Sequence, residues 1–168
     1  MASGGKGETR MTMHRDERDK VPMAALMLGA SGLALPVVAV IARLDAGTPP
    51  GTPLPAFLML MAFFSASLIL AFLGGIWWGL ALTRVEPERF GGLLALGIAP
   101  TVVALLIAGL SGWMPRTAAV ALGVAIVATL LVDRGLSARG LVPKWWMRLR
   151  VPLSLALGAV TAGLALLM

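Results

Sequence analysis

The side chains best suited to chemistry in this sequence are two tryptophan pairs and the charges that follow the second pair. Trp145-Trp146 is followed by Arg148 and Arg150. Residues three or four apart share one face of a helix, so we expect Trp145 to lie beside Arg148 and Leu149, and Trp146 beside Arg150. An arginine held over an indole ring makes a cation–π contact. The candidate pocket and packing residues are Gly74, Gly75, Trp77, Trp78, Gly79, Asp133, Trp145, Trp146, Arg148 and Arg150.

These residues allow two interpretations. Indole rings prefer the membrane–water interface, so both pairs could simply form an aromatic belt. Alternatively, the four indoles and the two arginines could line one shared pocket for an anionic lipid headgroup or a quinone-like ring. Asp133 is expected to end a helix, where a carboxylate is unfavourable beside the helix dipole and needs a cation. Arg148 and Arg150 are its expected partners, and the expected role is a structural ion pair or a solvated face.

The sequence gives little support for a metal site or a catalytic site. There are no cysteines and one histidine, His14, so a thiolate site or a multi-histidine site cannot form within one chain. Met11, Met13 and His14 resemble soft copper ligands, but we interpret them as incidental residues of a charged tail. No catalytic dyad or metal-binding helix motif is recognisable. We therefore expect no metal, no cofactor and no enzymatic activity.

The elements that would position these residues are membrane-spanning helices. Of the 168 residues, 58% are hydrophobic and 13% are charged, and the mean hydropathy is +0.90. A soluble domain has about twice that share of charge, so the solvent for this surface must be lipid. The sequence predicts an all-α bundle of five transmembrane helices in residues 21–168, after a disordered charged tail in residues 1–20. The expected spans are 22–43, 56–83, 91–110, 116–132 and 151–168.

Proline and glycine residues indicate where these helices are expected to kink, bend or pack closely. Pro36 is expected to kink the first span or to be absorbed by its neighbours. The second span is longer than the hydrocarbon core, and Gly74-Gly75 is its expected bend. Gly75 and Gly79 form a small-xxx-small motif, which we interpret as packing within the chain, with homodimerisation as the alternative. No ionisable residue falls inside these spans, which argues against a pump or an ion-coupled transporter.

The basic residues predict how the chain is threaded. All of the 14 Lys and Arg except Arg43 and Arg116 fall in the tail or in the second and fourth loops. By the positive-inside rule the N-terminus is cytoplasmic and the C-terminus periplasmic. Since the basic residues flank apolar runs, the net charge of +6 indicates membrane orientation, and we expect no nucleic-acid partner. The first span is longer than a signal-peptide core and lacks a cleavage site, so it is expected to remain.

The run from Phe72 to Leu82, FLGGIWWGLAL, resembles the signature of the bacterial domain-of-unknown-function 3429 family. Similar features elsewhere are Leu28-Gly29-x-x-Gly32, Ala99-Pro100, Asp133 and Pro143-Lys144-Trp145-Trp146-x-x-Leu149-Arg150. The resemblance covers Met23 to the C-terminus and extends to a mitochondrial relative, transmembrane protein 69. The family often has a histidine where Trp77 stands, so no role of that histidine can be transferred to this chain. The resemblance implies the architecture and assigns no activity.

The expected protein is therefore a multi-pass protein of the bacterial inner membrane. Its expected role is non-enzymatic: an accessory or assembly factor that binds lipid or other membrane proteins. The expected partners are the lipid bilayer, other membrane proteins and anionic lipid. The alternative is a small oligomeric transporter or channel, because five spans without buried charge make a poor pathway alone. A membrane-embedded enzyme is third, since nucleophiles and acids are missing at depth.

Overall fold

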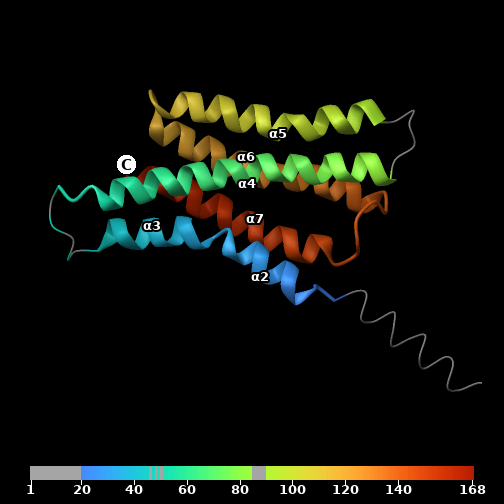
Figure 1. Cartoon of the computed structure of the whole chain (residues 1–168), viewed down its shortest axis with the longest axis horizontal. Coiled ribbons are helices and arrows are strands. Elements are labelled where there is room, and N and C mark those ends of the chain that lie inside the picture. The colour runs from blue at the N-terminus through green and yellow to red at the C-terminus, as the bar shows by residue number, and fades with distance from the viewer. Residues whose placement is uncertain (1–19, 46, 48, 50, 85–89) are drawn as a thin grey trace, which may run out of the picture.

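Five long apolar helices pack side by side and alternate in direction (Figure 1). The structure is a computed structural model that describes residues 20–45, 47, 49, 51–84 and 90–168. All of the predicted disordered tail except Lys20 lies outside these residues, and so does the Met11–His14 segment. The elements are α2 (Met23–Ser31), α3 (Ala34–Leu44), α4 (Leu54–Arg84), α5 (Phe90–Ser111), α6 (Pro115–Ala138), α7 (Trp146–Gly163) and the short 3-10 helix η2 (Leu164–Leu166). The all-α prediction is confirmed for the described residues, and each of the five helical segments is long and apolar enough to span a membrane.

The first segment is broken at Gly32 and Leu33, one helical turn before Pro36. α2 and α3 together cover Met23–Leu44, with a turn at Gly32 and Leu33 between them. A proline ring clashes with the carbonyl four residues earlier, and for Pro36 that residue is Gly32. Pro36 itself lies in the first turn of α3, where a missing backbone N–H costs no helical hydrogen bond. The break therefore occurs one turn before the proline.

The second segment is not interrupted at its glycine pair. α4 continues as an unbroken α-helix through Gly74 and Gly75 to Arg84. In the third segment, Pro100 lies inside α5 without interrupting it. The glycine pair is therefore not a break in the helix.

The last two helices begin or end at residues other than the predicted ones. α6 does not stop at Val132 but continues to Ala138, so Asp133 lies inside the helix. Its end is fixed at Gly140, whose φ of 68° suits a glycine. The Gly140 N–H binds the Ser137 carbonyl and the Leu141 N–H binds the Leu136 carbonyl, the pattern of a Schellman motif. α7 begins at Trp146 and so includes Arg150.

The centre of the bundle is formed by α4, α6 and α7. In each of these helices 39% of an 18-residue apolar stretch is buried inside the bundle. The share is 17% in α5 and 11% in the α2–α3 segment. α4 packs along α5 and α3, and α6 packs along α7. One core cluster includes Phe63, Leu70, Leu122, Ile126 and Leu157. The central helices thus bring residues far apart in sequence into one interior.

Two ends of the bundle can be distinguished. At the Arg-rich end, α4 and α6 finish while α2, α5 and α7 begin, and Arg134, Arg139 and Arg148 lie there (Figure 1). The far end contains the C-terminus together with Arg43 and Arg116. The candidate site residues lie nearer the Arg-rich end, on the last turns of α4 and α6 and the first turns of α7.

Candidate functional site

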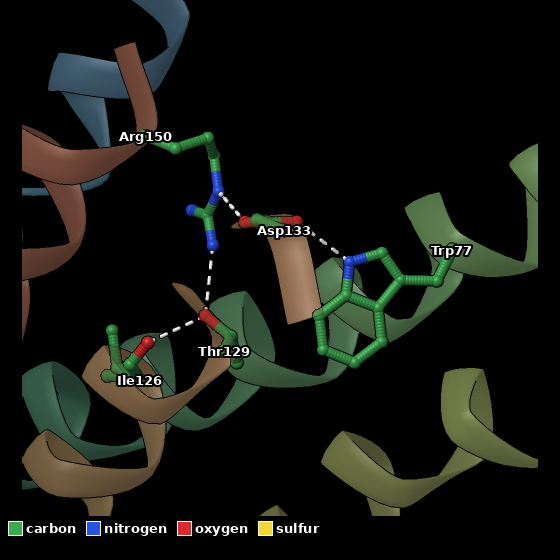
Figure 2. A network of polar contacts seen from close by, with 5 residues as sticks. All are labelled: Trp77, Ile126, Thr129, Asp133 and Arg150. Atoms are coloured by element: carbon green, nitrogen blue, oxygen red, sulfur yellow. Dashed lines mark hydrogen bonds and ion pairs between the residues drawn. The ribbon is translucent and has the colours of Figure 1, made fainter. Parts of the chain in front are cut away.

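An ion pair joins α6 and α7 inside the bundle. The Nε of Arg150 donates to Oδ2 of Asp133 at 2.7 Å. Asp133 is only 1% exposed and Arg150 only 7%. Figure 2 shows the carboxylate of Asp133 between Arg150 and Trp77. The expectation that no charge would lie within the spans is therefore wrong. Each charge is accommodated because the other one neutralises it.

The second carboxylate oxygen is held from α4. The indole Nε1 of Trp77 donates to Oδ1 of Asp133 at 2.9 Å, and Trp77 is 3% exposed. The aromatic-belt interpretation is therefore wrong for Trp77, whose ring is inside the bundle. Both oxygens of Asp133 accept a hydrogen bond, one from each neighbouring helix (Figure 2). This single carboxylate ties α4, α6 and α7 together.

Arg150 makes two further contacts. Its Nη2 donates to Oγ1 of Thr129 at 3.0 Å, and Thr129 donates in turn to the Ile126 carbonyl at 2.6 Å. The guanidinium carbon lies 5.9 Å from the ring centre of Trp146, one helical turn earlier. The predicted cation–π pairing of Trp146 and Arg150 is therefore confirmed. Figure 2 shows the other terminal nitrogen of Arg150 on the side away from Asp133.

The energetics of such a pair depend on how completely it is hydrogen-bonded. Removing a carboxylate or a guanidinium from water costs several kcal/mol per ion, and the mutual attraction offsets this only when the remaining groups are also satisfied. Here the carboxylate accepts two hydrogen bonds and the guanidinium donates two. The pair is therefore suited to fixing three helices in one register. Thr129 is a site residue that was not predicted, although it lies one helical turn before Asp133 on the same face of α6.

The remaining tryptophans point elsewhere. Trp78 is 39% exposed and donates its indole N–H to the Leu94 carbonyl of α5 at 2.9 Å. Trp145 lies beside Trp146, with ring centres 6.1 Å apart. Arg148 is exposed on the first turns of α7. The expected shared pocket is thus divided: Trp77 faces Asp133, Trp78 faces α5, and Trp146 faces Arg150.

The glycines next to the first tryptophan pair have two different roles. A Cβ on Gly74 would collide with the Gly97 carbonyl of α5, so α4 and α5 pack there backbone to backbone. Gly75 and Gly79 are exposed, and a Cβ on either would meet no atom within 4 Å. The prediction that the Gly75–Gly79 motif packs within the chain is therefore wrong. The close contact uses the neighbouring residue, one helical position earlier.

A cavity of about 530 Å³ lies between α2, α4 and α7, with Ile126 of α6 in its wall. It reaches the bundle surface, since the lining residues Leu28 and Phe72 are 75% and 68% exposed. Its lining is Ala25, Leu28, Gly29, Gly32, Leu33, Ile69, Phe72, Leu73, Ile76, Ile126, Trp146, Leu149, Arg150, Leu153, Ser154 and Leu157. Trp146 and Arg150 are thus the candidate residues that the structure brings to this cavity.

The lining of the cavity is suited to binding an apolar molecule. Its walls are apolar side chains, and its polar groups are an indole, a guanidinium and a hydroxyl. Pockets of roughly 300–1,000 Å³ with few polar groups are typical of small-molecule sites. Among the residues that the structure describes, no three His, Cys, Asp or Glu side chains are grouped as a metal site would require.

Five apolar helices around a buried polar network define a multi-pass helical membrane protein. Within that class, residues 21–166 match the family described as "Protein of unknown function (DUF3429)", and the chain belongs to this family. No match was found among the curated proteins or among the solved structures. The resemblance noted from the FLGGIWWGLAL run is thereby confirmed at the level of the family.

Proposed function

We propose that this protein is a non-enzymatic, lipid-binding membrane protein that acts as an accessory or assembly factor. The observation that carries the proposal is the cavity between α2, α4 and α7, which is apolar and reaches the bundle surface. A cavity opening among apolar helices faces lipid, so acyl chains are the molecules that reach it most readily. A bound lipid or a partner's apolar segment would also bury the exposed part of α2, which has no buried residue of its own.

A substitution that fills the cavity tests this proposal. Ala25 lines the cavity from α2, whereas Ala24 is exposed on the same helix and is not among the lining residues. We expect Ala25→Trp to reduce the lipid that co-purifies with the chain in mild detergent by at least about half. Ala24→Trp is the matched control and should co-purify with as much lipid as the parent chain. The measurement is the molar ratio of lipid to protein by mass spectrometry, and equal ratios for the two variants would contradict the proposal.

We further propose that the chain lies in the bacterial inner membrane with its N-terminus in the cytoplasm and its C-terminus in the periplasm. The support is the distribution of charge between the two ends of the bundle. Lys20, Arg134, Arg139, Lys144 and Arg148 lie at the Arg-rich end, whereas Arg43 and Arg116 lie at the far end. An excess of Lys and Arg on one side is the usual mark of the cytoplasmic face.

Because the chain has no cysteine, its orientation can be read from single introduced thiols. We expect Trp113→Cys, at a position 89% exposed at the far end, to react with a membrane-impermeant maleimide added outside intact cells. Arg139→Cys, at the Arg-rich end, should react only after the membrane is opened. The opposite labelling pattern would reverse the proposed orientation.

The alternative, a small oligomeric transporter or channel, is favoured by one observation. Ionisable residues inside membrane helices often mark an ion or proton pathway, and Asp133 and Arg150 are such residues. We prefer the binding role because this pair is already hydrogen-bonded to Trp77 and Thr129. The charge of Asp133 is already neutralised by Arg150, so a proton or a cation would have to compete with the guanidinium for the carboxylate.

A further inference from the structure

The polar side chains that line the cavity all come from one face of α7. Trp146, Arg150 and Ser154 are spaced four residues apart, so they follow one another along the helix. Each of them can donate a hydrogen bond, and no carboxylate lines the cavity. One wall of the cavity is therefore a row of donors, and the other lining side chains are apolar.

Two of these donors are buried without a partner. Neither the indole Nε1 of Trp146 nor the hydroxyl of Ser154 makes a hydrogen bond, and Ser154 is 1% exposed. Buried polar groups in proteins are nearly always hydrogen-bonded, so an unpaired donor that also lines a cavity is suited to a hydrogen bond with a molecule bound there. The second terminal nitrogen of Arg150 also makes no hydrogen bond with a described residue (Figure 2). The cavity thus offers three donors to a ligand that supplies acceptors.

The charge of the neighbourhood limits what that ligand can be. Asp133 already neutralises Arg150, and both side chains are buried. An anionic group placed against Arg150 would leave a net negative charge away from water, which is strongly unfavourable. A neutral acceptor such as a carbonyl oxygen satisfies the same donors without adding charge. The expectation of an anionic headgroup at this arginine is therefore not favoured by the geometry.

We propose that the cavity binds a neutral lipid whose polar end carries carbonyl oxygens, which accept hydrogen bonds from Trp146, Ser154 and Arg150. The apolar part of this lipid lies against Leu73, Ile76 and Leu153 of the cavity wall. The inference rests on the lipid-binding function proposed above and specifies its ligand class. Acyl esters and quinone rings both provide such carbonyl groups, and the experiment separates these two sources.

The test uses the purified full-length chain in mild detergent and four probes. The first two are dioleoylglycerol and its dialkyl ether analogue, which differ only in the two carbonyl groups. The others are a long-chain benzoquinone and the anionic lipid dioleoylphosphatidylglycerol. We expect the ester to bind about two- to tenfold more tightly than the ether for each hydrogen bond lost. If the benzoquinone binds more tightly than the ester, the carbonyl source is a quinone.

Variants identify the donors. Trp146→Phe keeps an aromatic ring for Arg150 but removes the N–H, and Ser154→Ala removes the hydroxyl. Each should weaken binding of the preferred carbonyl probe about two- to tenfold and leave binding of the ether unchanged. Thr161→Val is the matched control, because Thr161 is a buried, unpaired hydroxyl on α7 that is not among the cavity-lining residues.

The outcomes separate this inference from the proposed function. Equal binding of the ester and the ether, with no tighter binding of the benzoquinone, would overturn the carbonyl inference while lipid binding itself stands. Tightest binding of dioleoylphosphatidylglycerol would overturn the neutrality of the ligand. Absence of binding by all four probes would overturn both proposals together.

Discussion

Asp133→Asn is expected to lower the free energy of unfolding by about 3–5 kcal/mol. Asparagine keeps the shape of the side chain and can still accept the hydrogen bond from Trp77. It removes the negative charge, however, and leaves Arg150 buried without a counter-charge. The measurement is unfolding in detergent, followed by the fluorescence of the chain's own tryptophans.

A second substitution distinguishes a lost charge partner from a general packing defect. Asp133→Asn combined with Arg150→Met should be less destabilised than Asp133→Asn alone, because no charge then remains buried. Arg148→Gln is the matched control: it removes a cation from the same helix at an exposed position and should change stability by no more than about 0.5 kcal/mol. If Asp133→Asn were as stable as the parent, the ion pair would not be holding the three helices together.

Gly74→Ala is expected to destabilise the protein by about 1–3 kcal/mol, whereas Gly75→Ala should be neutral or stabilising by up to about 1 kcal/mol. The two substitutions are chemically identical and adjacent on α4. At Gly74 the added methyl group meets the Gly97 carbonyl, a backbone atom that cannot move without displacing α5. At Gly75 the methyl group meets nothing within 4 Å, so only the higher helix propensity of alanine contributes to the free energy of unfolding.

This pair can be measured by the same unfolding experiment, with the parent chain as reference. A similar pair on α6 provides an independent repeat. A Cβ on Gly123 would collide with the Gly158 carbonyl of α7, and one on Gly135 would meet nothing within 4 Å. Equal stability of Gly74→Ala and Gly75→Ala would mean that the backbones of α4 and α5 are not in contact at Gly74.

The fold was largely predictable from composition, because few backbone structures are stable in the interior of a lipid bilayer. Long apolar runs must form helices to satisfy their backbone hydrogen bonds, and this rule identified all five segments. The same reasoning ended α6 at its last apolar residue and began α7 at its first apolar residue after the loop, so both helices were predicted too short at the Arg-rich end. Asp133 and Arg150 were predicted to lie outside the spans, yet each lies within a helix because the other is there to neutralise it.

The candidate site was predictable only where its contacts are local. Trp146 and Arg150 are one turn apart on a helix, and this spacing alone predicted their contact. Trp77 and Asp133 are 56 positions apart, so nothing in their spacing indicates a hydrogen bond. The glycine motif was misleading for a related reason. Spacing shows that Gly75 and Gly79 share a face, but the tertiary packing decides whether that face meets another helix.

The buried ion pair also bears on how the chain enters the membrane. A single Asp or Arg costs an inserting helix up to about 3 kcal/mol at its centre and less near its ends, where Asp133 and Arg150 lie. α6 and α7 are the two least hydrophobic spans, with mean hydropathies of 1.9 and 1.7 against 2.2–2.5 for the others. If they enter one at a time, each carries an unpaired charge, whereas a hairpin of both carries a neutral pair.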